Sequence, residues 1–168
     1  GTINVDVLNG LCYQYKYDSR NRLAEKKLPG KQWEFIVYDK LDRPVATGPA
    51  LSPFKEETAS GWMITKYDAL GRPIYTGWMN QSATAATRNT LQTAQNNAAV
   101  LFETKTVNTI DGISADYSNG NEPTNFKLLT VNYYHRYGFP EAQSVPETVL
   151  GQGVITNIKG LASGSWTR

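Results

Sequence analysis

The amino-acid sequence predicts a mainly β protein, in which antiparallel hairpin repeats form an extended curved sheet with one inserted α-helix. Three observations predict this fold. A turn motif recurs three times, the flanking segments are rich in aromatic and β-branched residues, and one alanine-rich stretch has helical periodicity. We expect hairpin repeats over 1–79, the helix within 80–105, and degenerate hairpins with a truncated final strand over 106–168, together forming one structural unit.

The composition excludes several kinds of partner and site. Hydrophobic residues make up 40% of the chain, and ten tyrosines and four tryptophans favour half-buried β structure. A net charge of +2 does not favour electrostatic binding of nucleic acid or of anionic lipid. No apolar run approaches the roughly 18 to 20 residues of a membrane span. Cys12 is the only cysteine, which excludes an intrachain disulfide and a cysteine-based zinc cluster.

The repeated motif begins with a tyrosine and an aspartate, and an arginine follows five positions after the tyrosine. The residue before the arginine is Asn, Asp or Gly, the types that best tolerate a positive φ, so we expect a left-handed backbone there. The aspartate is expected to cap a type I turn by accepting backbone N–H bonds. The predicted turn residues are Tyr17, Asp18, Asn21 and Arg22; Tyr38, Asp39, Asp42 and Arg43; and Tyr67, Asp68, Gly71 and Arg72.

Strands are expected on both sides of each turn. The segments before the turns are "CYQYKY", "WEFIVY" and "WMITKY", and those after them are "RLAEK", "RPVAT" and "RPIYT". Pro44 and Pro73 cannot donate to a strand ladder, so we expect each at a strand start. Residues 48–61 are rich in Gly, Pro and Ser, and they predict a loop between the second and third repeats.

A fourth, divergent repeat is predicted around Tyr134. In this alignment His135 takes the aspartate position, Gly138 takes the left-handed position, and Phe139 replaces the arginine. Residues 117–123 also match the repeat at two turn positions, but we interpret them as a plain loop.

Between these repeats, residues 80–105 contain no Gly or Pro and have apolar residues at helical spacing, which predicts a helix of about five turns. Ser82 is its expected N-cap. We expect its small apolar residues to pack on the sheet and its Asn-, Gln- and Thr-rich side to face solvent, with a glycan- or partner-facing surface as the alternative. Asp111-Gly112 predicts a tight hairpin, residues 127–134 predict a strand, and residues 153–168 contain one more.

No catalytic, cofactor or metal site is expected. His135 is the only histidine and has no second His or Cys nearby, so its expected role is structural. Tyr13, Tyr15 and Tyr17 share one strand face, where core packing or cross-strand pairing is a commoner role than stacking on sugars or bases. The recurring arginines are expected to stack on neighbouring aromatic rings or to bond adjacent carbonyls.

The repeated motif resembles the YD repeat of the Rhs/YD-repeat family, whose units follow the pattern Tyr-Asp-x-x-Gly-Arg before an apolar strand. The segments "YDSRNRLAE", "YDKLDRPVAT" and "YDALGRPIYT" resemble these units, and the resemblance covers residues 11–78 well. In that family such sheets wrap into a hollow shell around a C-terminal toxin or effector. The resemblance therefore implies a segment of a long bacterial protein that is secreted or displayed on the cell surface.

The predicted function is that of a non-catalytic structural segment of such a shell or scaffold. Its expected partners are neighbouring repeats of the same parent chain, together with a glycan or an enclosed effector domain. The alternative is a carbohydrate- or protein-binding module on the cell surface that uses exposed Tyr and Trp residues.

Overall fold

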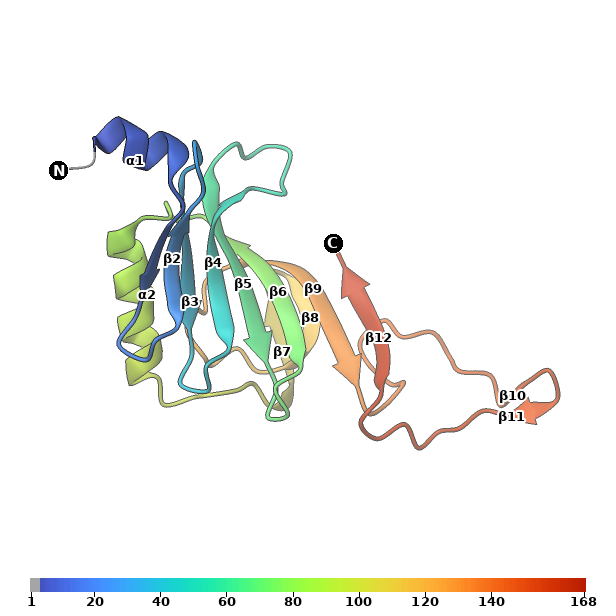
Figure 1. Cartoon of the computed structure of the whole chain (residues 1–168). Helices are drawn as coiled ribbons and strands as arrows, with labels where there is room; N and C mark the ends of the chain where they lie inside the picture. The colour runs from blue at the N-terminus through green and yellow to red at the C-terminus, as the bar shows by residue number, and fades with distance from the viewer. Residues whose placement is uncertain (1–3) are drawn as a thin grey trace.

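The computed structural model describes residues 4–168 and is built around one antiparallel sheet of eight strands (Figure 1). The strands lie in the order β1-β2-β3-β4-β5-β6-β9-β12, so chain neighbours are sheet neighbours up to β6. Their bounds are β1 Gln14–Tyr17, β2 Leu23–Lys27, β3 Trp33–Tyr38, β4 Pro44–Leu51, β5 Ser60–Tyr67, β6 Pro73–Met79, β9 Lys127–Tyr134 and β12 Ala162–Thr167. The mainly β prediction is confirmed, whereas the curvature of the sheet stays a prediction.

Three hairpins follow one another in the first half of the sheet: β1–β2, β3–β4 and β5–β6. In each hairpin the pairing register shifts next to the motif tyrosine, as expected where an extra residue forms a β-bulge beside the turn. Pro44 and Pro73 begin β4 and β6, as predicted. The predicted loop over 48–61 is shorter than expected, because β4 continues to Leu51 and β5 begins at Ser60.

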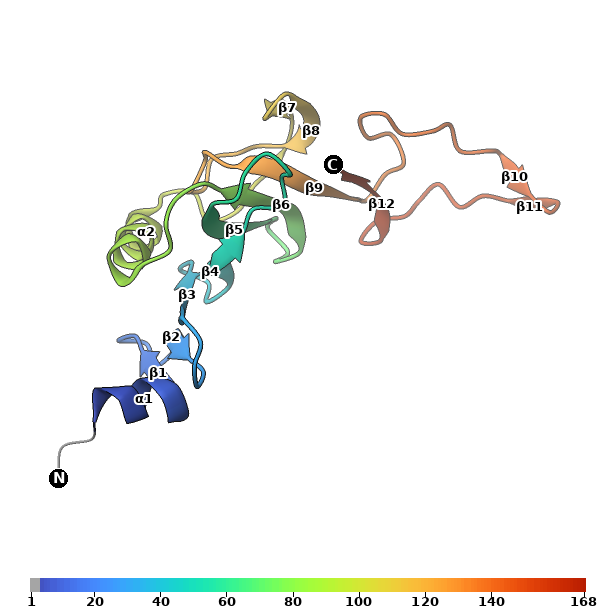
Figure 2. The same cartoon turned by 90° about the horizontal axis from the view of Figure 1, so that it is seen from above.

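The main core lies on one face of the sheet. A separate hairpin, β7 (Lys105–Ile110) and β8 (Ile113–Tyr117), contributes Ile110, Ala115 and Tyr117 to the same buried cluster as the sheet strands. The helix α2 (Ala85–Asn97) lies on that side too (Figure 2). The turn of the β7–β8 hairpin is Asp111-Gly112, with φ of 50° and 78°, which confirms the tight hairpin predicted there.

Helix α2 differs from its prediction in length. It begins after Thr84, whose side chain and that of Thr87 form a reciprocal capping box, and it ends at Asn97. Ser82 is therefore not the N-cap, and the helix is shorter than five turns. A Ser and a Thr two residues apart offer the same kind of cap, and the reciprocal bond from Thr87 selects Thr84.

The face that α2 turns inward was predicted correctly only in part, because Leu91 packs against the core as expected but the fully buried residues are polar. Its buried residues are Arg88, Gln92 and Gln95, so a polar side packs inward. The reason is that β2 and β3 pair only as far as Phe35, which leaves later backbone groups of β3 without a strand partner on that side. Gln92 supplies both a donor and an acceptor to the backbone of Tyr38, at 2.8 and 3.1 Å.

The connection between β9 and β12 corrects the predicted fourth turn. Gly138 does not have a left-handed backbone, and Phe139 stacks on Tyr133 at a ring distance of 4.3 Å instead of replacing an arginine. The turn is instead closed by residues distant in sequence: the N–H of His135 donates to the carbonyl of Leu161, and Gly160 has the left-handed backbone, with φ of 90°.

Residues 136–159 thus form an insertion within the fourth turn. This insertion carries the short strands β10 (Thr148–Val149) and β11 (Gln152–Gly153) and extends away from the sheet (Figure 1). The predicted strands over 127–134 and within 153–168 are confirmed as β9 and β12. A short helix that was not predicted, α1 (Val5–Leu11), precedes β1, and no helix within residues 4–168 is long and apolar enough to cross a membrane.

Candidate functional site

The three repeated turns are closed by the same set of bonds. In the third turn, Asp68 Oδ1 accepts the backbone N–H groups of Leu70 and Arg72 at 2.9 and 3.0 Å, and Asp68 Oδ2 accepts Nε–H of Arg72 at 2.7 Å. Asp18 and Asp39 make the equivalent bonds in the first and second turns, at 2.7 to 2.9 Å. Each aspartate is therefore a turn cap, because both of its oxygens are used inside its own turn.

The residue before each arginine has the left-handed backbone that the sequence predicts. The φ angles are 57° at Asn21, 62° at Asp42 and 74° at Gly71. The three residue types tolerate this conformation at low cost, which explains why this position of the repeat varies among them. The position encodes backbone geometry, and its side chain has no common contact in the three turns.

Each motif arginine also contacts the tyrosine of the next hairpin. The guanidinium carbon of Arg22 lies 4.6 Å from the ring centroid of Tyr38, and Arg43 lies 4.6 Å from Tyr67. The third step, from Arg72 to Tyr134, is 4.1 Å long. We call this series the arginine–tyrosine ladder; it consists of Arg22–Tyr38, Arg43–Tyr67 and Arg72–Tyr134. The predicted stacking of arginines on neighbouring aromatic rings is confirmed.

The tyrosine of each step donates a hydrogen bond back to the preceding hairpin. Its hydroxyl donates to the carbonyl of the residue that follows the arginine: Tyr38 to Leu23 at 3.0 Å, Tyr67 to Pro44 at 2.7 Å, and Tyr134 to Pro73 at 3.1 Å. Burial raises the pKa of all three tyrosines. Every step of the ladder thus combines one arginine–tyrosine stack with one hydrogen bond, and it links two strands that are neighbours in the sheet.

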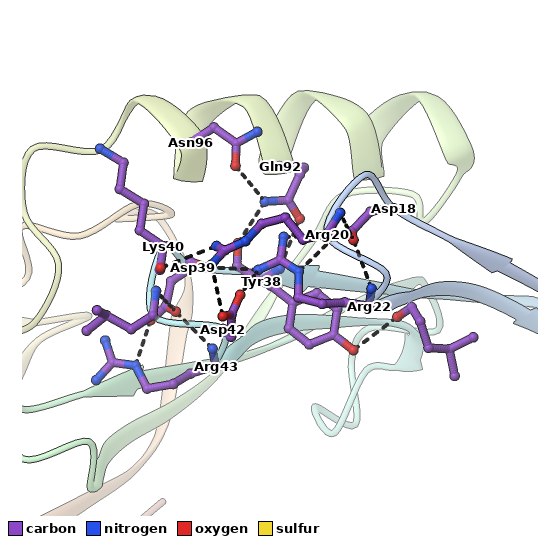
Figure 3. Close-up of polar contacts among 12 residues, drawn as sticks. Asp18, Arg20, Arg22, Tyr38, Asp39, Lys40, Asp42, Arg43, Gln92 and Asn96 are labelled. Atoms are coloured by element: carbon purple, nitrogen blue, oxygen red, sulfur yellow. Dashed lines mark hydrogen bonds and ion pairs between the residues drawn. The ribbon is translucent and has the colours of Figure 1, made fainter.

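The second turn shows how the ladder is completed by polar bonds between turns (Figure 3). Arg22 reaches from the first turn to Asp42 Oδ1 at 2.7 Å and to the carbonyl of Asp39 at 3.2 Å. Arg43 similarly donates to the carbonyl of Asp68 at 3.3 Å and to the carbonyl of Leu101 at 2.6 Å. Each guanidinium is therefore held by its own aspartate, by the next turn and by an aromatic ring.

These bonds favour the ionised aspartates. Burial by itself disfavours the charge on Asp18 and Asp68, but the hydrogen bonds and positive charge of Arg22 and Arg72 outweigh it. The pKa of each carboxyl is lowered below its ordinary value of 3.8. A carboxylate that is ionised and fully bonded in its own turn has no free oxygen with which to exchange a proton with a substrate.

His135 occupies the aspartate position of the fourth turn and has contacts at both ring nitrogens. Nδ1 accepts the backbone N–H of Gly160 at 2.8 Å, and Nε2 lies 2.6 Å from Nη2 of Arg72. Burial and the charges of Arg72 and Lys105 lower the pKa of His135 below its ordinary value of 6.5. The histidine closes a turn, which is the structural role that the sequence predicts for it.

Tyr15 and Tyr17 of β1, and Tyr13 just before it, differ from the tyrosines of the later strands. Tyr13, Tyr15 and Tyr17 are 65%, 49% and 60% exposed, so core packing, one of the two roles expected for them, is wrong. The reason is their position: β1 is an edge strand that pairs only with β2 among the described residues, and no arginine covers Tyr17. The other expected role, cross-strand pairing, fits Tyr15 and Tyr17, which lie opposite Lys26 and Leu23 of β2.

A buried polar cluster, which sequence reasoning missed, lies between the sheet and the loop after β8. The side chains of Lys66 and Glu103 are 3% and 0% exposed, and their charged atoms lie 3.2 Å apart. Glu103 also accepts from the hydroxyl of Ser118 at 2.6 Å and from the backbone N–H groups of Gly120 and Asn121 at 2.8 and 2.9 Å. We call these residues, with Asn119, whose side-chain oxygen accepts from Lys66, the Lys66–Glu103 cluster.

Burial lowers the pKa of Lys66, and Glu103 opposes this effect. Burial alone would raise the pKa of Glu103, but Lys66 and the three donors lower it below 4.5. One signal in the sequence points to this site: Trp62, Ile64 and Lys66 alternate along β5, which places the lysine on the core face. The identity of its partner has no local signal, because Glu103 lies in another part of the chain.

The arrangement as a whole joins hairpins and anchors loops. Searches against protein-family models, curated proteins and solved structures found no match to this chain.

Proposed function

We propose that this chain is a non-catalytic structural segment of a YD-repeat scaffold in a large exported bacterial protein, where it forms part of a wall around a C-terminal toxin or effector. The observation that carries the proposal is the arginine–tyrosine ladder, which repeats one stack and one hydrogen bond at three successive hairpin junctions. Such a junction serves the growth of a sheet by one hairpin after another.

The charged residues of the repeats support this role. The aspartate oxygens are bonded within their turns, and the arginines are bonded within and between turns. Repeat proteins gain stability from interfaces between neighbouring units, because no single unit buries its apolar face alone. The motif therefore supplies what an extended wall requires, namely the same interface at each step.

The experiment measures protection of an enclosed segment. The parent protein is digested with a non-specific protease, and the survival of the segment downstream of this chain is followed by mass spectrometry. We expect survival in the wild type and degradation in a variant with Arg22, Arg43 and Arg72 changed to Ala. Arg20→Ala is the matched control, because the Arg20 side chain is half exposed and is not part of the ladder.

Two outcomes would contradict the proposal. One is equal digestion of the wild type and the ladder variant. The other is catalytic turnover by the purified chain that is lost in His135→Ala while the thermal unfolding midpoint is unchanged.

Carbohydrate binding is the second candidate, favoured by the exposed tyrosines in and just before β1. Aromatic rings on an open strand present flat apolar faces on which a sugar ring can stack. A glycan array probed with the wild type and with a Tyr13→Ala/Tyr15→Ala variant tests it, and we expect hits that the variant loses. An array without hits above background removes this candidate.

A further inference from the structure

The arginine–tyrosine ladder has a direction, and its two ends differ. Each step needs an arginine from the earlier hairpin and a tyrosine from the later one. A hairpin added before β1 would have to supply an arginine to Tyr17. A hairpin added after β12 would have to supply a tyrosine, and this chain would have to supply the arginine.

The β1 end is ready to accept such a hairpin. Tyr17 occupies in β1 the place that Tyr38 occupies in β3, as the last residue of its strand, but within residues 4–168 neither its ring nor its hydroxyl has the contacts that Tyr38 makes. Apolar exposure continues along this end of the molecule, through Tyr15, Tyr13 and Leu11. Large exposed apolar residues that adjoin an unpaired strand edge are typical of a surface that is covered by another β element.

Helix α1 does not fill this place. It is held at the opposite end of the β1–β2 hairpin from the turn, where the N–H of Gly30 donates to the carbonyl of Asn9 at 3.3 Å and Lys27 donates to the Asn9 side chain at 2.7 Å. In Figure 1 the helix lies at one end of β1 and the turn of the first hairpin at the other. The ring of Tyr17, beside the turn, is therefore not covered by helix α1.

The β12 end lacks the group that continues the ladder. Leu161 occupies the arginine position of the fourth turn: its carbonyl accepts the N–H of His135 at 3.1 Å, just as the carbonyl of Arg72 accepts the N–H of Asp68 at 3.0 Å. The left-handed residue precedes it in both turns, as Gly160 and as Gly71. A leucine side chain cannot donate to a carbonyl of the next turn, and it cannot make a cation–π contact.

We propose that the β1 edge is the binding site for a further hairpin whose turn has an arginine directly after its left-handed residue, and that Leu161 closes the β12 edge to the same addition. The incoming arginine stacks on Tyr17, the Tyr17 hydroxyl donates to the carbonyl after that arginine, and the new strand pairs with β1. This inference rests on the proposed scaffold function and adds to it the direction in which the sheet grows. The three internal steps show what covers a tyrosine in this position.

The first experiment measures binding of a hairpin in trans. The probe is a backbone-cyclised peptide with the sequence of residues 60–79, which contains the third turn, and its control carries Arg72→Lys. We expect binding to the full chain by calorimetry, with protection of β1 amides in hydrogen exchange. The control should bind about tenfold more weakly, because lysine has no planar group to stack and bond at once. The probe should bind Tyr17→Ala weakly as well.

The second experiment tests whether an arginine at position 161 allows the β12 edge to bind another strand. Leu161→Arg supplies the missing guanidinium, so the β12 end of one molecule can cover Tyr17 of a second copy. We expect concentration-dependent association of Leu161→Arg in sedimentation velocity, and its loss in the double variant Leu161→Arg/Tyr17→Ala. Leu161→Lys is the matched control for charge, and it should associate much less.

Certain results would overturn the inference: peptide binding that is equal for the Arg72→Lys probe, or association of Leu161→Arg that survives Tyr17→Ala. Binding of a glycan that is lost in Tyr17→Ala, without any binding of the peptide, would assign the β1 edge to a sugar instead. These results are separate from a failure of the scaffold function, which would appear as catalytic turnover or as equal protease digestion.

Discussion

The arginine–tyrosine ladder and the Lys66–Glu103 cluster are both built from charged residues, yet they stabilise the molecule in different ways. The turns that carry the ladder repeat one arrangement, in which each aspartate pairs with the arginine four positions later, and Arg22 also pairs with Asp42 of the next turn. The cluster occurs once and joins residues 37 positions apart in the interior. Damage to one ladder step leaves the other steps intact, whereas loss of one partner in the cluster leaves a buried charge without compensation.

The largest effect is expected from removal of one charge in the cluster. Glu103→Gln leaves the Lys66 ammonium buried without its counter-ion and should lower the free energy of unfolding by about 3 to 5 kcal/mol. Urea denaturation measures this change. The control is Glu34→Gln, because the Lys26–Glu34 pair is partly exposed to solvent and should contribute at most about 1 kcal/mol. Equal losses of unfolding free energy in the two variants would show that the Lys66–Glu103 pair stabilises the fold no more than a surface ion pair does.

Acidification should weaken both regions. The pKa values of Asp18, Asp68 and Glu103 are lowered in the folded protein, so their contribution to stability is fully present above the ordinary values of 3.8 and 4.5 and is lost as the pH falls through the lower folded values. Each such carboxylate changes the free energy of unfolding by at most about 1.4 kcal/mol per pH unit.

Denaturation midpoints between about pH 5 and about pH 2 measure this loss. Asp68→Asn should be less stable than the wild type at neutral pH and should lose less on acidification. A variant with the same pH slope as the wild type would exclude Asp68 as a contributor.

The left-handed turn position is expected to have an intermediate effect. Gly71→Val forces a β-branched residue to positive φ and should cost about 1 kcal/mol or more, whereas Gly71→Asn should cost much less. Asn21 already has this backbone in the first turn, with φ of 57°. The nearest atom to a Cβ at Gly71 is Nη1 of Arg43, at 3.9 Å, so steric contact does not add to the cost. Equal losses in thermal unfolding would contradict the left-handed assignment.

The smallest expected effect is the difference in unfolding free energy between removing a tyrosine hydroxyl at an internal ladder step and removing the hydroxyl of Tyr17. Tyr67→Phe removes the hydroxyl that donates to Pro44 and should cost about 1 kcal/mol. Tyr17→Phe should leave the free energy of unfolding nearly unchanged, because the Tyr17 hydroxyl has no ladder bond within residues 4–168. A loss in Tyr17→Phe as large as in Tyr67→Phe would show that the β1 end is already covered.

The turns were predictable because their determinants are local. The Asn, Asp and Gly residues at the left-handed position, and the aspartate that bonds two and four residues ahead, lie within one short segment of chain. The alternation of Trp62, Ile64 and Lys66 also indicates which face of β5 is buried. The sequence predicted only that each arginine stacks on a neighbouring aromatic ring. The strand order then identified that ring as the tyrosine of the next hairpin.

The remaining features depend on contacts between distant segments. The inward face of α2 was predicted as apolar, but the unpaired backbone of Tyr38 required an amide, which Gln92 supplies. The fourth turn was assigned to Gly138, whereas Gly160 and Leu161 close it from the far side of an insertion.

Local sequence therefore decides each repeated turn and the strands beside it, because the bonds that close the turn join residues within five positions of each other. Tertiary structure decides which groups are buried, which charge meets Lys66, and which tyrosine remains uncovered. The physical reason is that desolvation and pairing depend on what the rest of the chain places nearby, and no window of neighbouring residues contains that information.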